Sequence, residues 1–308
     1  MTRLPPALRR RPPPEALRWV ERAIGRGTEV VDVLRLRGGT SAAVHLLRLR
    51  GAPAGLDAVV LRRFVRAEWL AEEPDLASHE GRVLEALRGA GLPVPECLAI
   101  DLEGGECDVP AVLMTRVPGR IDLAPRDLAS YLRQLASFLP ALHQIGGTEG
   151  LPAYRPWFRP RPFEAPGWSA RPELWQRANE LAALPPPEFP ATLIHRDYHP
   201  ANTLWRYGRL SGVTDWVNGC NGPSGIDVAH CCVNLSALFG IATADEFRAA
   251  YEAVAGVEQH PYWDLLDALD TGPPASGQWN DAGRLDLTNA VLRPRVEEYL
   301  EGLVRQLS

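Results

Sequence analysis

The sequence predicts an α+β protein in which strands gather in the N-terminal part and helices fill the rest. Before residue 117, apolar residues alternate along five short segments, which is the period of half-buried strands. Between the third and fourth segments, and again over residues 118–308, apolar residues recur at helical spacing. Strands and helices that are separated along the chain are typical of α+β folds, and 308 residues suffice for two domains.

The N-terminal elements follow in chain order. Three prolines precede a short helix over residues 15–24. The expected strands are 29–37, 43–50, 58–62, 94–100 and 110–115, with one helix at 76–88. Arg62 and Arg63 end the third strand on opposite faces, so Arg63 is expected to face solvent.

Val117-Pro118-Gly119 breaks the pattern after the fifth strand and is the natural domain boundary. We therefore expect one domain over residues 1–117 and a second over 118–308. Residues 147–172, rich in proline and aromatic residues, are expected to form a loop. Helices are expected at 128–145, 172–183, 226–238, 243–255, 261–270 and 284–306, the last of them interrupted at Pro294.

Composition narrows the class of protein. The hydrophobic content of 45% and the charged content of 23% are ordinary for a globular protein. No apolar run is long enough for a membrane helix, and prolines interrupt the basic N-terminus, so neither a membrane partner nor a signal peptide is expected. Five cysteines without a C-x-x-C pair favour a cytoplasmic location. Residues 241–308 carry twelve acidic and five basic side chains, which argues against nucleic acid as a partner.

The most informative motif is His195-Arg196-Asp197, followed by Asn202 and then Asp215. A carboxylate and a carboxamide stand five residues apart after an apolar run, and a strand-turn-strand pattern leads to the second carboxylate. Phosphoryl transfer from a nucleotide needs one carboxylate to meet the attacking hydroxyl. It also needs oxygen ligands for the metal ion that neutralises the phosphates.

The spacing H-R-D-x-x-x-x-N is that of the protein-kinase catalytic loop, but His199-Pro200 and Asp215-Trp216 resemble the aminoglycoside phosphotransferase family. That family usually has H-G-D-x-H-x-x-N, so Arg196 is a departure. The resemblance implies a bilobal protein-kinase-like fold, with a five-stranded antiparallel sheet and a helix in the N-lobe and a mainly helical C-lobe. It also implies Mg²⁺ as cofactor, ATP or GTP as phosphoryl donor, and a small-molecule acceptor.

The resemblance also assigns roles to the loop residues. Asp197 would be the catalytic base, and Asn202 and Asp215 would hold Mg²⁺. His195 and Asp227 would support the loop from behind, and His199 would hold its bend before proline.

The expected nucleotide site lies in the N-terminal domain. A glycine-rich turn, Gly38, Gly39, Thr40 and Ser41, joins the first two strands where the family covers the phosphates. Arg62 stands where the family has lysine. All 33 basic residues are arginine, which indicates a coding bias, and arginine can still bind phosphate.

A carboxylate should orient Arg62, and Glu80 is preferred over Glu85 because it lies nearer the start of its helix. After the fifth strand, Thr115 and Val117 are expected to contact the purine through their backbone. This kind of contact does not distinguish ATP from GTP.

Two features suggest what the acceptor could be. The acidic C-terminal segment, with Asp264 and Asp267, would suit a cationic acceptor. The tryptophans Trp157, Trp263 and Trp279 could instead form a flat wall for a ring. Both remain open at this stage.

The leading hypothesis is therefore a phosphotransferase that acts on an alcohol group of a small molecule, with an antibiotic as one candidate. The alternatives are a metabolite kinase of the choline or homoserine kinase kind and a catalytically inactive kinase-like binding protein. A protein kinase is disfavoured, because only eleven residues separate Asp215 from Asp227 and leave no long activation segment. The acceptor and the oligomeric state do not follow from the sequence.

Overall fold

The structure is a computed structural model that describes residues 6–36, 42–157, 163–271, 284 and 286–308. Its contacts divide the chain into two compact units. Unit 1 is Met1–Gly119 with Ser211–Asn218, and unit 2 is Arg120–Leu210 with Gly219–Ser308. The first break lies two residues after the expected boundary. The return of Ser211–Asn218 to unit 1 was not predicted; in that segment the Val213 N–H donates to the Pro93 carbonyl (2.9 Å).

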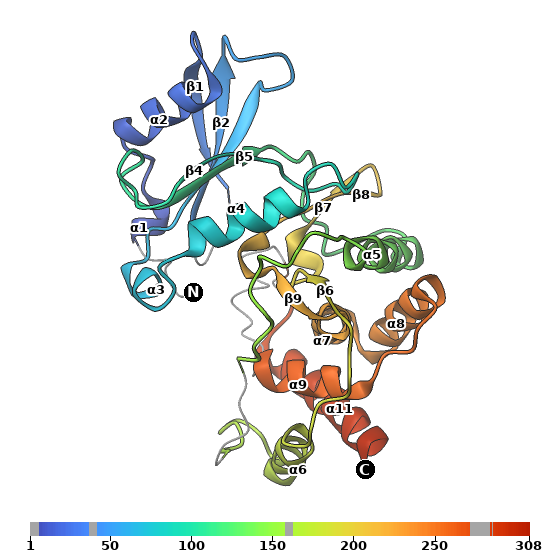
Figure 1. Ribbon diagram of the computed structural model, residues 1–308. Helices are drawn as coiled ribbons and strands as arrows, with labels where there is room; N and C mark the ends of the chain where they lie inside the picture. Colours follow the sequence, from blue (N-terminus) through green and yellow to red (C-terminus); the bar gives the residue numbers. More distant parts are fainter. Residues whose placement is uncertain (1–5, 37–41, 158–162, 272–283, 285) are drawn as a thin grey trace. The chain divides into compact units, whose positions relative to one another are not determined.

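Unit 1 is built on a five-stranded sheet in which every neighbouring pair is antiparallel, as predicted (Figure 1). The strand order is β1-β2-β3-β5-β4. The strands are β1 (Glu29–Arg35), β2 (Ala43–Arg50), β3 (Ala58–Arg63), β4 (Cys97–Asp101) and β5 (Ala111–Thr115). The helices α2 (Pro14–Ile24) and α4 (Leu76–Ala86) were predicted, whereas the short α1 (Pro6–Arg9) and α3 (Ala67–Glu72) were not.

Successive residues of β3 point to opposite faces of the sheet, and the two faces have different partners. Leu61 joins the core that Trp19 and Val20 of α2 complete. Arg62 turns to the other face, where it meets Glu80 of α4. A Cβ on Gly81 would lie 2.1 Å from Ile100 Cδ1, so glycine lets α4 approach β4 closely enough for this contact.

Arg63 contradicts the sequence prediction. It is buried, 4% exposed, and its guanidinium pairs with Asp108 instead of facing solvent. The turn that follows β4 supplies Asp108, which a periodicity argument restricted to the strand could not anticipate.

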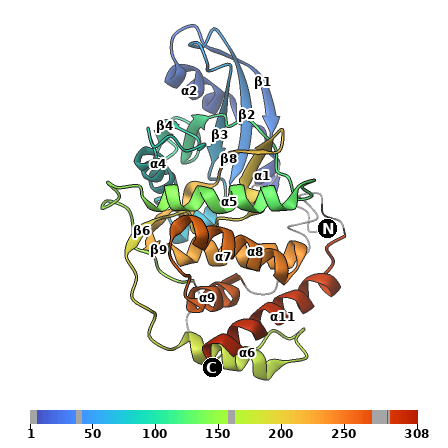
Figure 2. The ribbon, with the colours of Figure 1, turned by 90° about the vertical axis from the view of Figure 1, so that its right-hand side faces the viewer.

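Unit 2 is mainly helical, as predicted, and α7 (Gly225–Phe239) lies at its centre (Figure 2). Gly225 through Leu238 are all buried. The helix packs against α8 (Ile241–Ala255), α9 (Pro261–Thr271) and α11 (Asn289–Leu307). The remaining α-helices are α5 (Leu128–His143), which packs on α8, and α6 (Pro172–Ala182).

Short strands frame the central loops. β6 (Ala191–Ile194) pairs antiparallel with β9 (Cys220–Pro223), which the sequence did not predict. β7 (Thr203–Arg206) and β8 (Arg209–Val213) form a two-stranded sheet. Two 3₁₀ turns follow β6 and β8, namely η1 (Pro200–Asn202) and η2 (Trp216–Asn218).

The predicted interruption at Pro294 is wrong, because α11 continues through it from Asn289 to Leu307. A proline inside a helix removes one backbone hydrogen bond and crowds the preceding turn. Here the helix buries Leu292, Val296, Tyr299 and Leu300, and this tertiary packing outweighs the local cost. Among the residues that the structure describes, no helix combines the length and the apolar character needed to cross a membrane.

Candidate active site

The loop that carries Asp197 begins where β6 ends and is anchored from beneath by Asp227. The carboxylate of Asp227, fully buried near the start of α7, accepts the backbone N–H groups of His195 (2.9 Å) and Arg196 (2.7 Å). The Asp197 N–H then donates to His195 Nδ1 (3.2 Å). His195 and Asp227 therefore hold the loop from behind.

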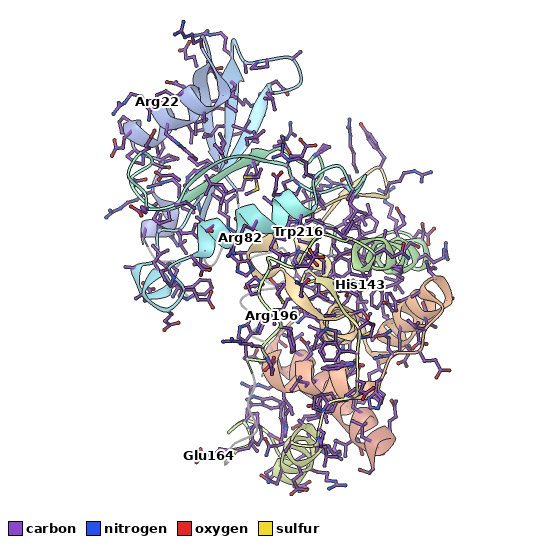
Figure 3. The ribbon with its side chains drawn as sticks, in the orientation of Figure 1. Arg22, Arg82, His143, Glu164, Arg196 and Trp216 are labelled. Atoms are coloured by element: carbon purple, nitrogen blue, oxygen red, sulfur yellow. The ribbon has the colours of Figure 1, made fainter. Side chains whose placement is uncertain are left out.

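His143, at the end of α5, supports Asp227 in turn. Its Nε2 lies 3.1 Å from Asp227 Oδ2, and its Nδ1 lies 3.2 Å from the Tyr251 hydroxyl. Figure 3 labels His143 at this position in unit 2. The sequence reasoning missed this residue, because nothing local distinguishes a histidine at a helix end from any other.

Within the loop, Asn202 is directed at Asp197. Its Nδ2 donates to the backbone carbonyl of Asp197 (2.9 Å) and to Oδ2 of the same residue (2.9 Å). The 3₁₀ turn η1 brings the two residues together across their five-residue spacing. This amide–carboxylate pair is the predicted core of the catalytic loop.

Arg196 occupies the position where the resemblance leads one to expect glycine, and its backbone explains that expectation. Its φ is 68°, a left-handed conformation that costs an ordinary L-residue about 1 kcal/mol or more. The guanidinium, labelled in Figure 3, lies 3.7 Å from the Trp157 ring centroid and donates to the Arg155 carbonyl. These contacts tie residues 155–157 to the catalytic loop.

His230 is a second residue of this site that the sequence did not single out. Its Nε2 lies 3.0 Å from Asp197 Oδ1, and its Nδ1 lies 3.1 Å from Asp267 Oδ1. His199 Nε2 approaches the same Asp197 oxygen at 3.6 Å. The available signal was helical spacing, because His230 stands three residues after Asp227 on α7 and lies on the same side.

The charges around Asp197 act on its pKa. Burial alone would raise the pKa of this carboxyl, but the neighbouring His199 and the hydrogen bond from His230 outweigh burial and hold the pKa well below its usual range. Burial lowers the pKa of His230, but Asp267 and Asp197 on either side raise it well above the ordinary value.

Asp197, His199 and His230 are also close enough for one metal ion, since their ligand atoms lie within 4.8 Å of one another. The hydrogen bonds disfavour this use. His199 Nδ1 accepts the Ala201 N–H (3.4 Å), which leaves the ring proton on Nε2, the atom that faces Asp197. His199 is thus oriented as a donor to Asp197 and not as a metal ligand.

Unit 1 contains the second predicted group. Arg62 NH1 donates to Glu80 Oε1 (2.9 Å), and Arg62 NH2 donates to Asp215 Oδ1 (2.6 Å). The competing candidate Glu85 pairs with Arg88 at the surface instead. Burial, together with the negative charge of Asp215, raises the pKa of Glu80 to about 7 against the effect of Arg62. The two acids in turn raise the pKa of Arg62 against the effect of burial.

The predicted Mg²⁺ ligands fit that ion by the chemistry of their donor atoms. Mg²⁺ prefers hard oxygen ligands. The Asp215 side chain is 30% exposed whereas Glu80 is 1% exposed, so Asp215 is the acid of its group that an ion can reach. Because the side-chain nitrogen of Asn202 donates to Asp197, the side-chain oxygen of Asn202 is the atom that would serve as a ligand of the ion. Asp215 belongs to unit 1 and Asn202 to unit 2.

The remaining nucleotide residues are only partly described. Gly38, Gly39, Thr40 and Ser41 lie outside the described residues. The Thr115 N–H donates to the Glu96 carbonyl (2.9 Å), so a purine contact there would have to use the Thr115 carbonyl. Val117 is half-buried, and Gly212 packs so closely on it that a Cβ would lie 2.1 Å from Val117 Cγ1.

The predicted acceptor residues separate into two groups. Asp264 is 1% exposed, with both oxygens bonded to Arg248 and one also to Tyr299, and Trp263 packs in the core against Ile226. Neither presents a surface to an acceptor, which corrects the prediction for these two residues. Asp267 is committed to His230, Trp157 is 52% exposed, and Trp279 lies outside the described residues.

Comparison with known proteins bears on the family of this chain and on its fold. The model of the phosphotransferase enzyme family matches residues 32–270. Homoserine kinases of Rhizobium meliloti and Mesorhizobium japonicum are 29% and 28% identical over 193 and 168 residues. These matches cover 55% and 47% of this chain, and they span 56% and 49% of the relatives' own lengths, about half of each.

Solved structures resemble the fold over nearly the whole chain. A protein assigned as an aminoglycoside phosphotransferase from Ralstonia eutropha has a TM-score of 0.61 at 18% identity and covers 96% of this chain and 99% of its own. A thermostable aminoglycoside phosphotransferase bound to ADP and hygromycin B has a TM-score of 0.58 at 20% identity, with 94% and 98% covered. A type I macrolide 2′-phosphotransferase has a TM-score of 0.56 at 19% identity, with 94% and 96% covered. The protein-kinase-like fold follows from this likeness.

Proposed function

Because the chain belongs to the phosphotransferase enzyme family, we propose that it transfers the terminal phosphoryl group of ATP or GTP to a hydroxyl of a small molecule. The observation that carries the proposal is the loop in which Asp197 and Asn202 bond to each other above a buried Asp227. A carboxylate that is fixed in this way can receive an acceptor hydroxyl in one defined orientation, and orientation is most of what phosphoryl transfer asks of a protein.

In the proposed reaction, the acceptor hydroxyl donates to the carboxylate of Asp197. The acceptor oxygen forms a bond to the terminal phosphorus, and the bond from that phosphorus to the bridging oxygen breaks. The electron pair leaves with the nucleoside diphosphate, and the acceptor proton passes to Asp197. Because the carboxylate is a weak base, this proton moves late, when the new oxygen–phosphorus bond has formed.

Arg62 would bind the phosphates of the nucleotide, with Glu80 fixing the guanidinium so that it presents its donors in a fork. Asp215 and Asn202 would hold Mg²⁺, which when bound neutralises charge on the phosphates. The buried Glu80 keeps Arg62 in place when Asp215 turns to the metal ion.

The acceptor class has two candidates within this function. The likeness to enzymes that act on aminoglycosides and macrolides supports an antibiotic. A metabolite kinase is the second candidate, supported by the local identity with two homoserine kinases. A catalytically inactive binding protein would not need the Asp197–Asn202 pair.

The test is a panel assay with purified protein, Mg²⁺ and either ATP or GTP. Aminoglycosides, macrolides, peptide antibiotics, nucleosides, and amino alcohols including choline and homoserine are supplied one at a time. Acceptor-dependent release of nucleoside diphosphate, with one phosphate found on the acceptor by mass spectrometry, supports the proposal. Asp197→Asn is the control that must lose this activity. Nucleotide binding without any acceptor-dependent release would favour the inactive binding protein.

A further inference from the structure

His230 stands between two carboxylates inside unit 2, and the activity proposed above does not by itself call for it. Asp197 Oδ1 lies 3.0 Å from Nε2, while both oxygens of Asp267 lie 3.1 and 3.2 Å from Nδ1. His230 is 8% exposed and Asp267 is 4% exposed. The three residues come from α7, α9 and the catalytic loop, so tertiary packing assembles the group.

Counting protons fixes the charge of His230. A neutral imidazole carries one N–H, yet here both ring nitrogens face a carboxylate oxygen at hydrogen-bond distance. In a neutral His230, one ring nitrogen would therefore place its lone pair against a lone pair of a carboxylate oxygen. Putting the missing proton on Asp197 is disfavoured, because Asn202 donates to Oδ2 and His199 presents its N–H to Oδ1. Putting it on Asp267 is disfavoured too, because both Asp267 oxygens face Nδ1, at 3.1 and 3.2 Å, and a proton on one would leave the other against the Nδ1 lone pair. An imidazolium that donates to both acids satisfies every contact.

The surroundings agree with a cation at this position. Asp270 on α9 is a further acid near Asp267 and His230, and burial together with the charge of Asp267 raises its pKa to about 7, so that it is only partly ionised at neutral pH. The His199 ring meets the His230 ring edge-on, with centroids 5.5 Å apart, so it does not compete for either nitrogen of His230. The negative charge beside the imidazolium therefore comes from Asp197 and Asp267, the two acids that His230 contacts directly.

The contacts of His230 and Asn202 together fix the orientation of the Asp197 carboxylate. His230 holds Oδ1 and Asn202 holds Oδ2, so the carboxylate plane cannot turn about its last bond. Oδ2, which accepts from Asn202, still has lone-pair capacity for one more donor. A hydroxyl can therefore bond to Asp197 without displacing either partner, in a direction set by the plane.

We propose that His230 is a positioning residue for the transfer reaction: as an imidazolium braced by Asp267, it fixes the carboxylate of Asp197 in the orientation that receives the acceptor hydroxyl. This role rests on the proposed phosphotransferase function. It also accounts for the burial of two ionisable groups, His230 and Asp267, which contributes little to stability compared with an apolar core of the same volume.

The first experiment examines the charge of His230 and needs no acceptor. The full-length protein, labelled with ¹⁵N-histidine, is examined by NMR at about pH 8, where an ordinary imidazole with a pKa of about 6.5 is neutral. One histidine with both ring nitrogens protonated is expected. That signal should vanish in His230→Gln, change in Asp267→Asn, and persist in the control His260→Gln, since His260 is exposed. A neutral His230 at this pH overturns the proposal.

The second experiment measures transfer with an acceptor found in the panel assay. His230→Gln and Asp267→Asn should lower kcat by about tenfold to a hundredfold, with the KM for nucleotide unchanged. Asp267→Asn keeps the shape of the side chain, so it remains informative if thermal melting shows that His230→Gln is misfolded. A parent-like kcat in a folded variant rejects the positioning role.

The two proposals fail in different ways. If no acceptor in the panel is phosphorylated while the doubly protonated His230 is present, the phosphotransferase proposal fails and the charge assignment stands. If transfer occurs and His230 is neutral or dispensable, the positioning role fails and the proposed function stands.

Discussion

Each unit of the protein buries one cation between two carboxylates, and the two groups differ in the nature of that cation. In unit 1, Arg62 lies between Glu80 and Asp215; in unit 2, His230 lies between Asp267 and Asp197. The guanidinium stays charged at any pH that a protein tolerates, whereas the imidazolium can lose its proton. The same arrangement is therefore permanent in unit 1 and titratable in unit 2.

The two groups share a second feature. One acid of each is deeply buried, with side-chain exposures of 1% for Glu80 and 5% for Asp267. The other acid is about equally accessible in both, with 30% for Asp215 and 29% for Asp197. In both units the buried acid fixes the cation, and the cation fixes the acid to which the chemistry is assigned. Substituting either the buried acid or the accessible acid of a group distinguishes these roles.

The largest effect on transfer is expected from substituting Asp197, the accessible acid of the unit 2 group. Asp197→Ala should lower transfer by at least about a hundredfold, because a positioned proton acceptor is worth about that much or more. Nucleotide affinity, measured by isothermal titration, should persist, since Arg62, the residue proposed to bind the phosphates, belongs to unit 1. Near-parental transfer by this variant would remove Asp197 from the mechanism.

Asp215, the accessible acid of the unit 1 group, should act through the metal ion. Asp215→Ala is expected to abolish the Mg²⁺ dependence of nucleotide binding, and Asn202→Ala to weaken it, because a carboxylate contributes more to a hard cation than an amide does. Magnesium titrations of nucleotide affinity measure both. Curves that overlay the parental curve would exclude these two residues as ligands.

The buried end of the unit 1 group offers a matched pair on one helix. Glu80→Gln should raise the KM for nucleotide about tenfold, because Arg62 keeps Asp215 as its remaining charged partner and loses its fixed orientation. Glu85→Gln, five residues further on α4, should change nothing, since Glu85 pairs only with Arg88 at the surface. Equal KM values for the two variants would contradict the orienting role of Glu80.

The titratable cation predicts a pH dependence confined to the unit 2 group. His230 has a raised pKa in the folded state, so its stabilisation is fully present below about pH 6.5 and is lost as pH rises through the folded-state value. Its neighbours Asp197, Asp267, His199 and Asp270 are kept in both proteins compared. The free energy of unfolding in urea, parent minus His230→Gln, should fall on the alkaline side. A difference that stays constant with pH would indicate a neutral His230.

The sequence predicted the parts of this protein that depend on local pattern. Strand alternation and helical spacing located all five strands of the unit 1 sheet, and motif spacing selected Asp197, Asn202 and Asp215. The choice of Glu80 over Glu85 also followed from position on one helix. Each of these inferences needed only the period of one element or the order of residues in one loop. The five strands and the Arg62–Glu80 pair are confirmed, and the roles of Asp197, Asn202 and Asp215 stay predictions.

What the sequence missed depends on contacts between distant elements. His230, on α7, pairs with Asp197, which lies 33 positions earlier in the chain. Asp264 pairs with Arg248 of another helix and is therefore not offered to an acceptor. Pro294 failed to end α11 because buried side chains on both sides of it hold the helix together. An acidic segment read from composition likewise cannot reveal which of its acids are already paired inside the fold.

The smallest expected effect concerns the acceptor, and it asks whether the acids near the unit 2 group attract a cation. With Asp264 bonded to Arg248 and Asp267 to His230, Asp270 is the acid of α9 that remains a candidate. Burial, together with the charge of Asp267, raises the pKa of Asp270 to about 7, so a cationic group beside it would restore the ionised form. Asp270→Asn should then raise the KM for a cationic acceptor a few fold and leave that for nucleotide unchanged.

Added salt should likewise raise the KM for a cationic acceptor, because charges are screened over about 8 Å at physiological ionic strength. Asp245→Asn, an exposed acid on α8, is the matched control. An acceptor KM that survives both the salt and the substitution would point to a neutral acceptor, held by aromatic contact such as the exposed Trp157 offers.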